Sequence, residues 1–245
     1  MNTRRQRLRR FLLAAFFLAL PVTLNYYSPY LMTTGTVERV ATFSLLFWLA
    51  VFATAFVLGR SFCGWLCPFN GLQQLWESVG IRPLKRVRFL PIVKYALWAA
   101  WVAAVFGIAI SVGGWTRIDP LYLTENGVSV SSAGNLVTYF MLVLITLAPL
   151  ALGRRGFCRH LCPFGVWGIV AEKLGHALHI PRLMLTADAA ACTGCGSCSR
   201  ACPMQLPVTE MARAGAMRTT ECFMCETCAD VCPNHVIGVG FGRAE

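Results

Sequence analysis

The sequence predicts an α-helical membrane domain over residues 1–186, followed by a small α+β domain over residues 187–245. Three observations support this prediction: four long apolar stretches, an internal repeat at an offset of 95 residues, and eight closely spaced cysteines near the C-terminus. Composition agrees, because the mean hydropathy is +0.58 and 13% of residues are charged, compared with about a quarter in soluble domains.

The four apolar stretches are residues 11–31, 41–58, 91–110 and 136–152. Each is about long enough to cross a hydrocarbon core of roughly 30 Å as a helix. Pro21 and Pro149 are tolerable there, because neighbouring helices satisfy freed carbonyl groups. A cleaved signal peptide is the alternative for the first stretch, but no small-x-small cleavage site follows and the apolar run is long, so we expect a retained helix.

Positive charge is distributed asymmetrically around these stretches. The N-terminus and the segments after the second and fourth stretches hold 16 Lys and Arg residues, whereas the two opposite loops hold only Arg39 and Arg117. The positive-inside rule therefore predicts a multi-pass membrane protein with both termini in the cytoplasm. The basic residues flank apolar spans and form no patch with interleaved aromatics, so no nucleic-acid partner is expected.

The internal repeat aligns two cysteine motifs. An offset of 95 places Phe-Cys-Gly-Trp-Leu-Cys-Pro-Phe, which contains Cys63 and Cys67, on Phe-Cys-Arg-His-Leu-Cys-Pro-Phe, which contains Cys158 and Cys162. Each unit crosses the membrane twice in the predicted topology, so both motifs lie on the same side. The four transmembrane helices thus form a tandem repeat of two hairpins, and a pseudo-twofold axis along the membrane normal brings the cysteine pairs together.

The C-terminal cysteines form two copies of Cys-x2-Cys-x2-Cys-x3-Cys-Pro, the signature of a bacterial ferredoxin with two [4Fe-4S] clusters. The spacing lets three thiolates wrap one cluster from a tight loop, while we expect the fourth cysteine to begin a helix that points away and to ligate the other cluster. The predicted ligands are Cys192, Cys195, Cys198 and Cys232 for cluster one, and Cys222, Cys225, Cys228 and Cys202 for cluster two.

Zinc is the alternative occupant of four-thiolate sites. The duplication, the proline after each fourth cysteine and the match to the crossed-ligand spacing favour iron–sulfur clusters instead. Gly194 and Gly196 fit a close approach of the backbone to cluster sulfide. Disulfides are not expected, because these are metal-ligand spacings on the reducing side of the membrane.

The paired Cys-x3-Cys-Pro motifs are less specific. Spacing i, i+4 puts both sulfurs of a pair on one helix face. Two pairs brought together supply four thiolates, so Cys63, Cys67, Cys158 and Cys162 are candidates for a third iron–sulfur cluster or another metal. Redox thiols that exchange with a disulfide, or simply small buried residues, remain the alternatives.

Two further features have a functional and an ordinary interpretation. His160 lies between two of these cysteines, where it is a ligand or proton-carrying group in one interpretation and an ordinary residue in the other. The loop over residues 113–122 combines Trp115, Tyr122, Arg117 and Asp119, which suits either a quinone or partner site or simple interfacial anchoring.

The motif order resembles the NapH-type membrane ferredoxins: paired Cys-x3-Cys-Pro motifs after the second and fourth helices, then a two-cluster ferredoxin. It is similar also to the membrane part of NosR and NirI proteins and to the CcoG/RdxA family. The NapH resemblance implies a quinol dehydrogenase subunit of the bacterial cytoplasmic (inner) membrane, with the quinone pool and a periplasmic or membrane reductase system as partners. NosR proteins have a large periplasmic flavin-binding domain, and CcoG proteins have an extra domain after the ferredoxin. The longest predicted outer loop here covers only residues 111–135 and 13 residues follow Cys232, so by size we expect the NapH type.

Two functions follow from these features. The first is an electron-transfer subunit that links the quinone pool, or a cytoplasmic donor, to a redox complex. The second is a maturation factor that reduces copper or a disulfide with the Cys-x3-Cys pairs, as CcoG resemblance implies. No Met- or His-rich metal-transfer segment accompanies the pairs, which favours the first; a redox sensor would need an output domain.

Overall fold

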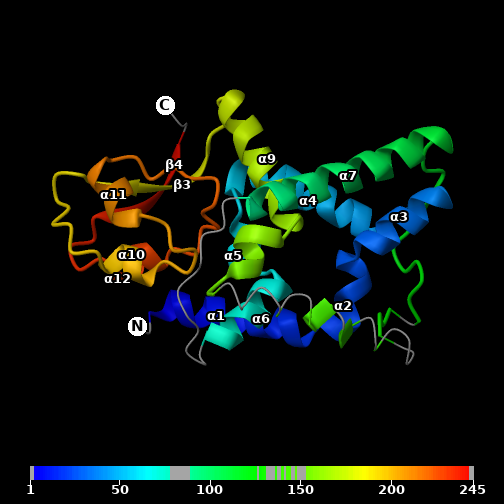
Figure 1. Cartoon of the computed structure of the whole chain (residues 1–245), viewed down its shortest axis with the longest axis horizontal. Helices are drawn as coiled ribbons and strands as arrows, with labels where there is room; N and C mark the ends of the chain where they lie inside the picture. Colours follow the sequence, from blue (N-terminus) through cyan, green and yellow to red (C-terminus); the bar gives the residue numbers. More distant parts are fainter. Residues whose placement is uncertain are drawn as a thin grey trace.

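A computed structural model describes residues 3–77, 89–125, 127–130 and 153–242, together with scattered positions between 136 and 147. Figure 1 shows a helical part and, beside it, a small unit at the C-terminal end of the chain. The fourth apolar stretch, residues 136–152, lies largely outside the described residues, as does its Pro149.

The C-terminal unit is closed by a two-stranded antiparallel sheet. Strand β3 (Arg182–Ala187) pairs with β4 (Ile237–Gly242) along its whole length. Between the strands lie three short helices, α10 (Ser197–Ala201), α11 (Val208–Arg213) and α12 (Thr227–Val231). The sheet therefore begins five residues before the expected domain boundary at residue 187.

The first apolar stretch is divided into three helices. Helix α1 (Arg4–Leu18) is followed by α2 (Leu20–Tyr27), at a bend of 83°, and by α3 (Pro29–Val37). Prolines lie in the first turns of α2 and α3, where a missing N–H does no harm, and the Ser28 hydroxyl accepts from Leu31 N–H to cap α3. The apolar run predicts one uninterrupted helix, but the prolines and the Ser28 cap within it divide it into three.

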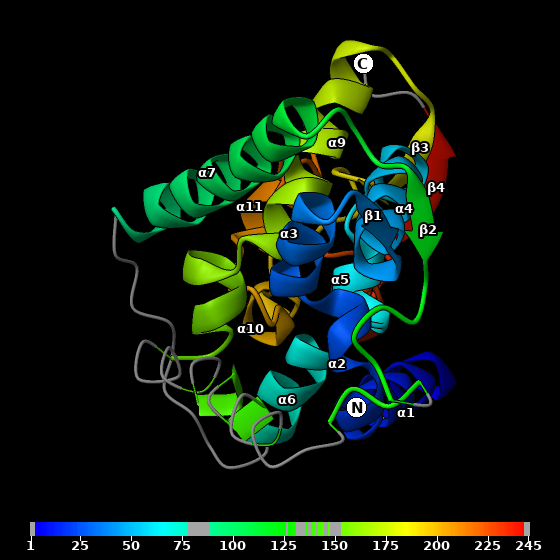
Figure 2. The ribbon, with the colours of Figure 1, turned by 90° about the vertical axis from the view of Figure 1, so that its right-hand side faces the viewer.

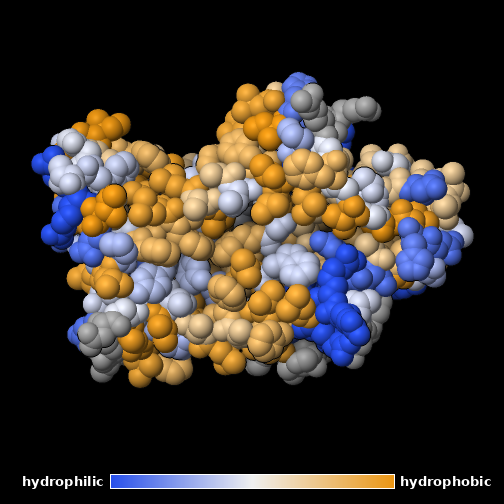
Figure 3. Space-filling model, turned by 180° about the vertical axis from the view of Figure 1, so that it is seen from behind, coloured by the Kyte–Doolittle hydropathy of each residue, from blue (hydrophilic) through white to orange (hydrophobic). Residues whose placement is uncertain are grey.

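The second and third stretches form helices α4 (Phe43–Leu58) and α7 (Leu90–Ser111). Residues 91–111 of α7 make the one described helix that is long and apolar enough to cross a bilayer. Two bent pairs reach that length if each counts as one broken span: α1 with α2, and α4 with Ser61–Leu75 at 100°. Hydrophobic side chains cover much of the surface of the helical part (Figure 3).

The two repeats place matching elements on matching residues. Helices α5 (Ser61–Trp65) and α6 (Pro68–Glu77) correspond to η2 (Phe157–Leu161) and α9 (Phe164–Ala177). The side chains of Phe69 and Phe164, 95 residues apart in the chain, stack with ring centroids 6.2 Å apart and an interplanar angle of 3°. The amphipathic helices of the two repeats thus meet at equivalent residues.

The segment that follows α3 also pairs with the segment that follows α7. Strand β1 (Val40–Thr42) runs parallel to β2 (Arg117–Asp119), so the loop of the first hairpin joins the segment after α7. Figure 2 shows these strands beside α4. The Trp115 indole N–H donates to the Thr36 hydroxyl at 3.2 Å, and Tyr122 is buried against Leu31 and Val40. Both aromatics of this loop therefore have packing roles.

Candidate functional site

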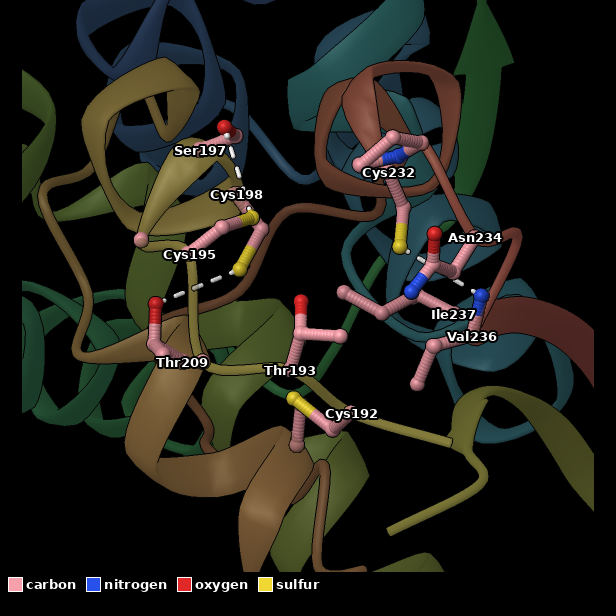
Figure 4. A pocket seen from close by; sticks show the side chains of 14 residues that line it. Cys192, Thr193, Cys195, Ser197, Cys198, Thr209, Cys232, Asn234, Val236 and Ile237 are labelled. Carbon is pink, nitrogen blue, oxygen red and sulfur yellow. Dashed lines mark hydrogen bonds between the residues drawn. The ribbon is translucent and has the colours of Figure 1, made fainter. Parts of the chain in front are cut away.

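The four cysteines predicted for cluster one line a single cavity. Its walls include Cys192, Cys195, Cys198 and Cys232, and its empty volume, open to solvent, is about 350 Å³. Figure 4 shows the four sulfur atoms facing this common space, three from one loop and that of Cys232 from the opposite side. The structure therefore brings together one distant and three local cysteines, as the crossed-ligand pattern requires.

The four cysteines predicted for cluster two line a second cavity, of about 380 Å³. They are Cys202, Cys222, Cys225 and Cys228, with apolar side chains between them. Nowhere in the described chain do three or more His, Cys, Asp or Glu side chains converge closely enough to hold a single metal ion. The thiols instead surround a volume, an arrangement that fits the body of a cubane cluster.

Both cysteine loops use left-handed backbone conformations. Gly194 and Gly196 have φ of 70° and 76°, and the equivalent residues of the second loop, Met224 and Glu226, have φ of 52° and 59°. Glycine adopts such angles freely, whereas Met and Glu adopt them only where the surroundings hold them. The tight curvature that wraps three thiols around one cavity is thus common to both loops.

The expected position of each fourth cysteine, at the start of a helix, was wrong. Cys198 and Cys228 lie inside α10 and α12, and the fourth cysteines, Cys202 and Cys232, are the C-terminal caps of these helices rather than their first residues. Helices α10 and α12 contact one another. Each helix therefore carries its fourth cysteine across to the neighbouring cavity at its C-terminal end.

Backbone N–H groups point at the two crossing sulfurs. Leu206 N–H donates to Cys202 Sγ at 3.5 Å, and Val236 N–H donates to Cys232 Sγ at 3.3 Å. These donors are four residues beyond each cysteine, so the two halves of the domain have the same geometry. Such N–H···S contacts stabilise thiolate and raise the reduction potential of a bound cluster.

The environments of the thiols range from buried to exposed. Burial, reinforced by the neighbouring Cys225, raises the pKa of Cys222 to about 12. Burial also raises the pKa of Cys158 to about 11 and that of Cys162 to about 12. Cys195 is at the surface, where hydrogen bonding with Ser197 lowers its pKa. The buried thiols are therefore protonated at neutral pH until a metal centre displaces the protons.

The two Cys-x3-Cys pairs also come together, forming what we call the cysteine quartet: Cys63, Cys67, Cys158 and Cys162. Every pair among the four thiols interacts electrostatically. Cys67 and Cys162 lie in an aromatic core with Phe69 and Phe157. The Gln73 amide donates to Cys158 Sγ at 3.3 Å.

The cysteine quartet lies directly under the loop of cluster two. Cys63 and Cys158 pack against the core of the C-terminal unit. The Trp65 indole N–H donates to the Met224 carbonyl at 2.9 Å, and a Cβ on Gly64 would lie 2.1 Å from the Phe223 carbonyl oxygen. Helix α1 joins the same junction, because the Gln6 amide donates to the Cys225 carbonyl at 3.0 Å.

Several cations that were predicted only to set topology are buried at this junction. Arg60, Lys94 and Arg155 are 3%, 1% and 0% exposed. Lys94 and Arg60 bind the Glu221 carboxylate at 2.9 and 3.5 Å. A lysine inside a predicted span was the one available signal that a buried acidic partner was needed. His160 is also buried, at 2% exposed.

Comparison with known families explains both cysteine arrangements. A model described as a 4Fe-4S binding domain matches residues 40–86 and again residues 135–181. The matched segments start 95 residues apart, which confirms the internal repeat, and they contain all four cysteines of the quartet. A second model, described as a 4Fe-4S dicluster domain, matches residues 184–233.

Curated relatives carry related names. The chain is 25% identical to the putative electron transport protein YccM of Escherichia coli, over 83% of this chain and 57% of that protein. It is 30% identical to the methylamine utilization ferredoxin-type protein MauN of Methylobacillus flagellatus, over 59% and 48%. It is 26% identical to the ferredoxin-type protein NapH of Haemophilus influenzae, over 74% and 62%.

The chain spans between about half and two thirds of the length of these relatives. No solved structure matches the chain significantly. The repeated 4Fe-4S binding domain, the dicluster domain and the ferredoxin-type relatives agree with the motif order read from the sequence. The chain is a ferredoxin-type protein with 4Fe-4S domains, homologous to the proteins named NapH, MauN, NirI and YccM.

Proposed function

We propose that the chain is a membrane-bound electron-transfer protein that carries electrons between the quinone pool and a redox partner complex. The observation that carries this proposal is the contact between the cysteine quartet and the loop of cluster two. Bound iron–sulfur clusters supply one-electron redox chemistry. The residues of the chain bind them, keep water away from them and fix their order.

Three cysteine sets succeed one another in the proposed order. The quartet holds a third cluster, Cys202 with Cys222, Cys225 and Cys228 holds the second, and Cys192, Cys195 and Cys198 with Cys232 holds the first. Packing of Cys63 and Cys158 against the C-terminal core supports this order, as does the shared helix pair α10 and α12. Exposure of Cys195 suits exchange with a partner at the outer end.

The proposed membrane arrangement has four spans in two hairpins, residues 1–186, and a cytoplasmic ferredoxin domain. The repeat, the apolar helix α7 and the pairing of β1 with β2 support this arrangement. Excess Lys and Arg on the ferredoxin side favours cytoplasmic termini. In this arrangement, quinone molecules in the bilayer reach the protein close to the buried cysteine quartet.

Reduction of the purified protein by quinol tests this function. The protein is reconstituted anaerobically into liposomes that contain a reduced quinone, and cluster reduction is followed by EPR. We expect the wild-type protein to be reduced and a Cys67→Ser, Cys162→Ser variant, which retains the ferredoxin cysteines, to be reduced much more slowly.

Equal reduction of both proteins would contradict the role of the quartet. Reduction of added Cu(II) or of a disulfide, without any exchange with quinol, would instead support a maturation factor of the CcoG type. Cys195→Ser is a useful control, because it alters the exposed cluster and leaves the quartet intact.

A further inference from the structure

Two buried arginines occupy equivalent positions in the two repeats. Arg60 and Arg155 are 95 residues apart, and each lies three residues before the first cysteine of its pair. Each crosses to the amphipathic helix of the other repeat: Arg155 donates to the Asn70 carbonyl at 2.8 Å and pairs with Glu77 at 2.9 Å. Arg60 packs against Gly165, the counterpart of Asn70.

The buried charges around the cysteine quartet do not balance. Four cations there are at most 5% exposed: Arg9, Arg60, Lys94 and Arg155. Glu77 forms an ion pair with Arg155, and Glu221 with both Lys94 and Arg60. Glu172 also interacts electrostatically with Arg60, but its ion pair is with Arg182. Arg9 binds the neutral Gln6 side chain and the Gly64 carbonyl. Among the described residues, these four cations therefore outnumber the carboxylates that form ion pairs with them by two.

No undescribed internal segment supplies the missing charge. Residues 78–88 and 131–152 contain no Asp or Glu. Arg182 is paired with Glu172, whereas Arg5, 37% exposed, faces two carboxylates, Glu226 and Asp230, and leaves one negative charge in excess there. Buried charge without a partner costs several kcal/mol per ion, so the excess of buried cations beside the cysteine quartet favours an anion at that place.

The cysteine quartet is the group that the cations face. Arg60 interacts electrostatically with Cys63, Cys158 and Cys162, and Arg155 interacts with Cys158. Protonated thiols and disulfides carry no charge, whereas four thiolates around an oxidised cubane core carry about two negative charges. The excess of buried cations therefore favours a cluster over thiols or a disulfide, which would leave these cations uncompensated.

We infer that Arg60 and Arg155 are positioning residues that hold the quartet's cluster as an anion and set its reduction potential. This inference rests on the third cluster of the proposed function. Reduction adds negative charge, and nearby buried cations stabilise the reduced form. Removing either cation lowers the potential of this cluster more than that of the two ferredoxin clusters.

The test is an EPR-monitored redox titration of the full-length protein in detergent. We expect Arg155→Gln and Arg60→Gln each to lower the midpoint potential of the quartet's cluster. Arg154→Gln is the matched control, because the Arg154 side chain is 39% exposed and comes no closer than 3.9 Å to the Glu77 carboxylate. Arg155→Lys keeps the charge and should keep a potential close to the wild type.

A double variant separates charge from folding. Arg155→Gln leaves Glu77 without its partner, whereas Arg155→Gln with Glu77→Gln removes both charges together, so its potential should shift less. Wild-type protein with about eight irons would refute the third cluster itself. About twelve irons, with unchanged potentials in Arg60→Gln and Arg155→Gln, would refute the role of the arginines alone. If the glutamine variants do not fold, a strong downward shift in Arg60→Lys and Arg155→Lys, which keep the charge, would refute it as well.

Discussion

Gly64→Ala tests the contact between the cysteine quartet and the ferredoxin domain. The added Cβ would lie 2.1 Å from the Phe223 carbonyl oxygen and 3.0 Å from its ring. Ordinary contact begins at 3.4 Å, so the loop of cluster two has to retreat by more than 1 Å. Overpacking of this kind costs about 1–3 kcal/mol. The Phe223 carbonyl belongs to a backbone segment that the Trp65 and Gln6 side chains hold through hydrogen bonds to the next two carbonyls, so the strain is expected to loosen the domain contact.

The assay combines thermal unfolding of the detergent-purified protein with EPR of the reduced clusters. We expect a lower melting temperature and a weaker magnetic interaction between the second and third clusters. Gly107→Ala is the matched control: Gly107 lies in α7 with nothing within 4 Å of the added Cβ. Alanine is favoured over glycine in a helix by about 1 kcal/mol. Gly64→Ala protein that matches Gly107→Ala in both measurements would refute the contact.

Three other substitutions probe the site. Cys232→Ser should abolish the same EPR signal as Cys195→Ser, whereas loss of the signal removed by Cys225→Ser would refute crossed ligation. Glu221→Gln leaves two buried cations without a carboxylate, at a cost of about 3–5 kcal/mol, so it should lower the melting temperature; wild-type unfolding would contradict this. Burial alone would raise the pKa of Asp230, but hydrogen bonds from Arg5 and Gln6 hold it below its usual value. Its stabilising contribution is thus complete above a pH of about 4 and is lost as pH falls through the lower folded pKa, and Asp230→Asn should remove this acid-dependent loss of stability.

Local spacing predicted the cysteine arrangement well, because the chemistry depends on short loops. The spacing of Cys192, Cys195 and Cys198 demands a tight turn, whereas the helix that we expected to begin at each fourth cysteine ends there instead. The family model that matches two segments confirmed the repeat. The ligand sets themselves stay predictions, although the cavities contain the expected cysteines.

Long-range contacts were not predictable from the same patterns. Counting Lys and Arg near the membrane treats Arg60 and Arg155 like exposed residues. Their burial, however, depends on ion pairs with Glu221 and Glu77, respectively. Glu221 is 161 residues from Arg60 in the chain. Hydropathy likewise merged α1, α2 and α3 into one span, because an average over many residues conceals the capping by Ser28. The attachment of α1 to Asp230 through Arg5 gives no signal in the sequence.

Counting iron and sulfide in anaerobically purified, full-length protein tests the central claim most directly. The account predicts about twelve irons and twelve sulfides per chain, as three [4Fe-4S] clusters require, and a decrease to about eight in a Cys63→Ser, Cys158→Ser variant. About eight irons in the wild-type protein would contradict it, because the cysteine quartet would then hold no iron–sulfur cluster.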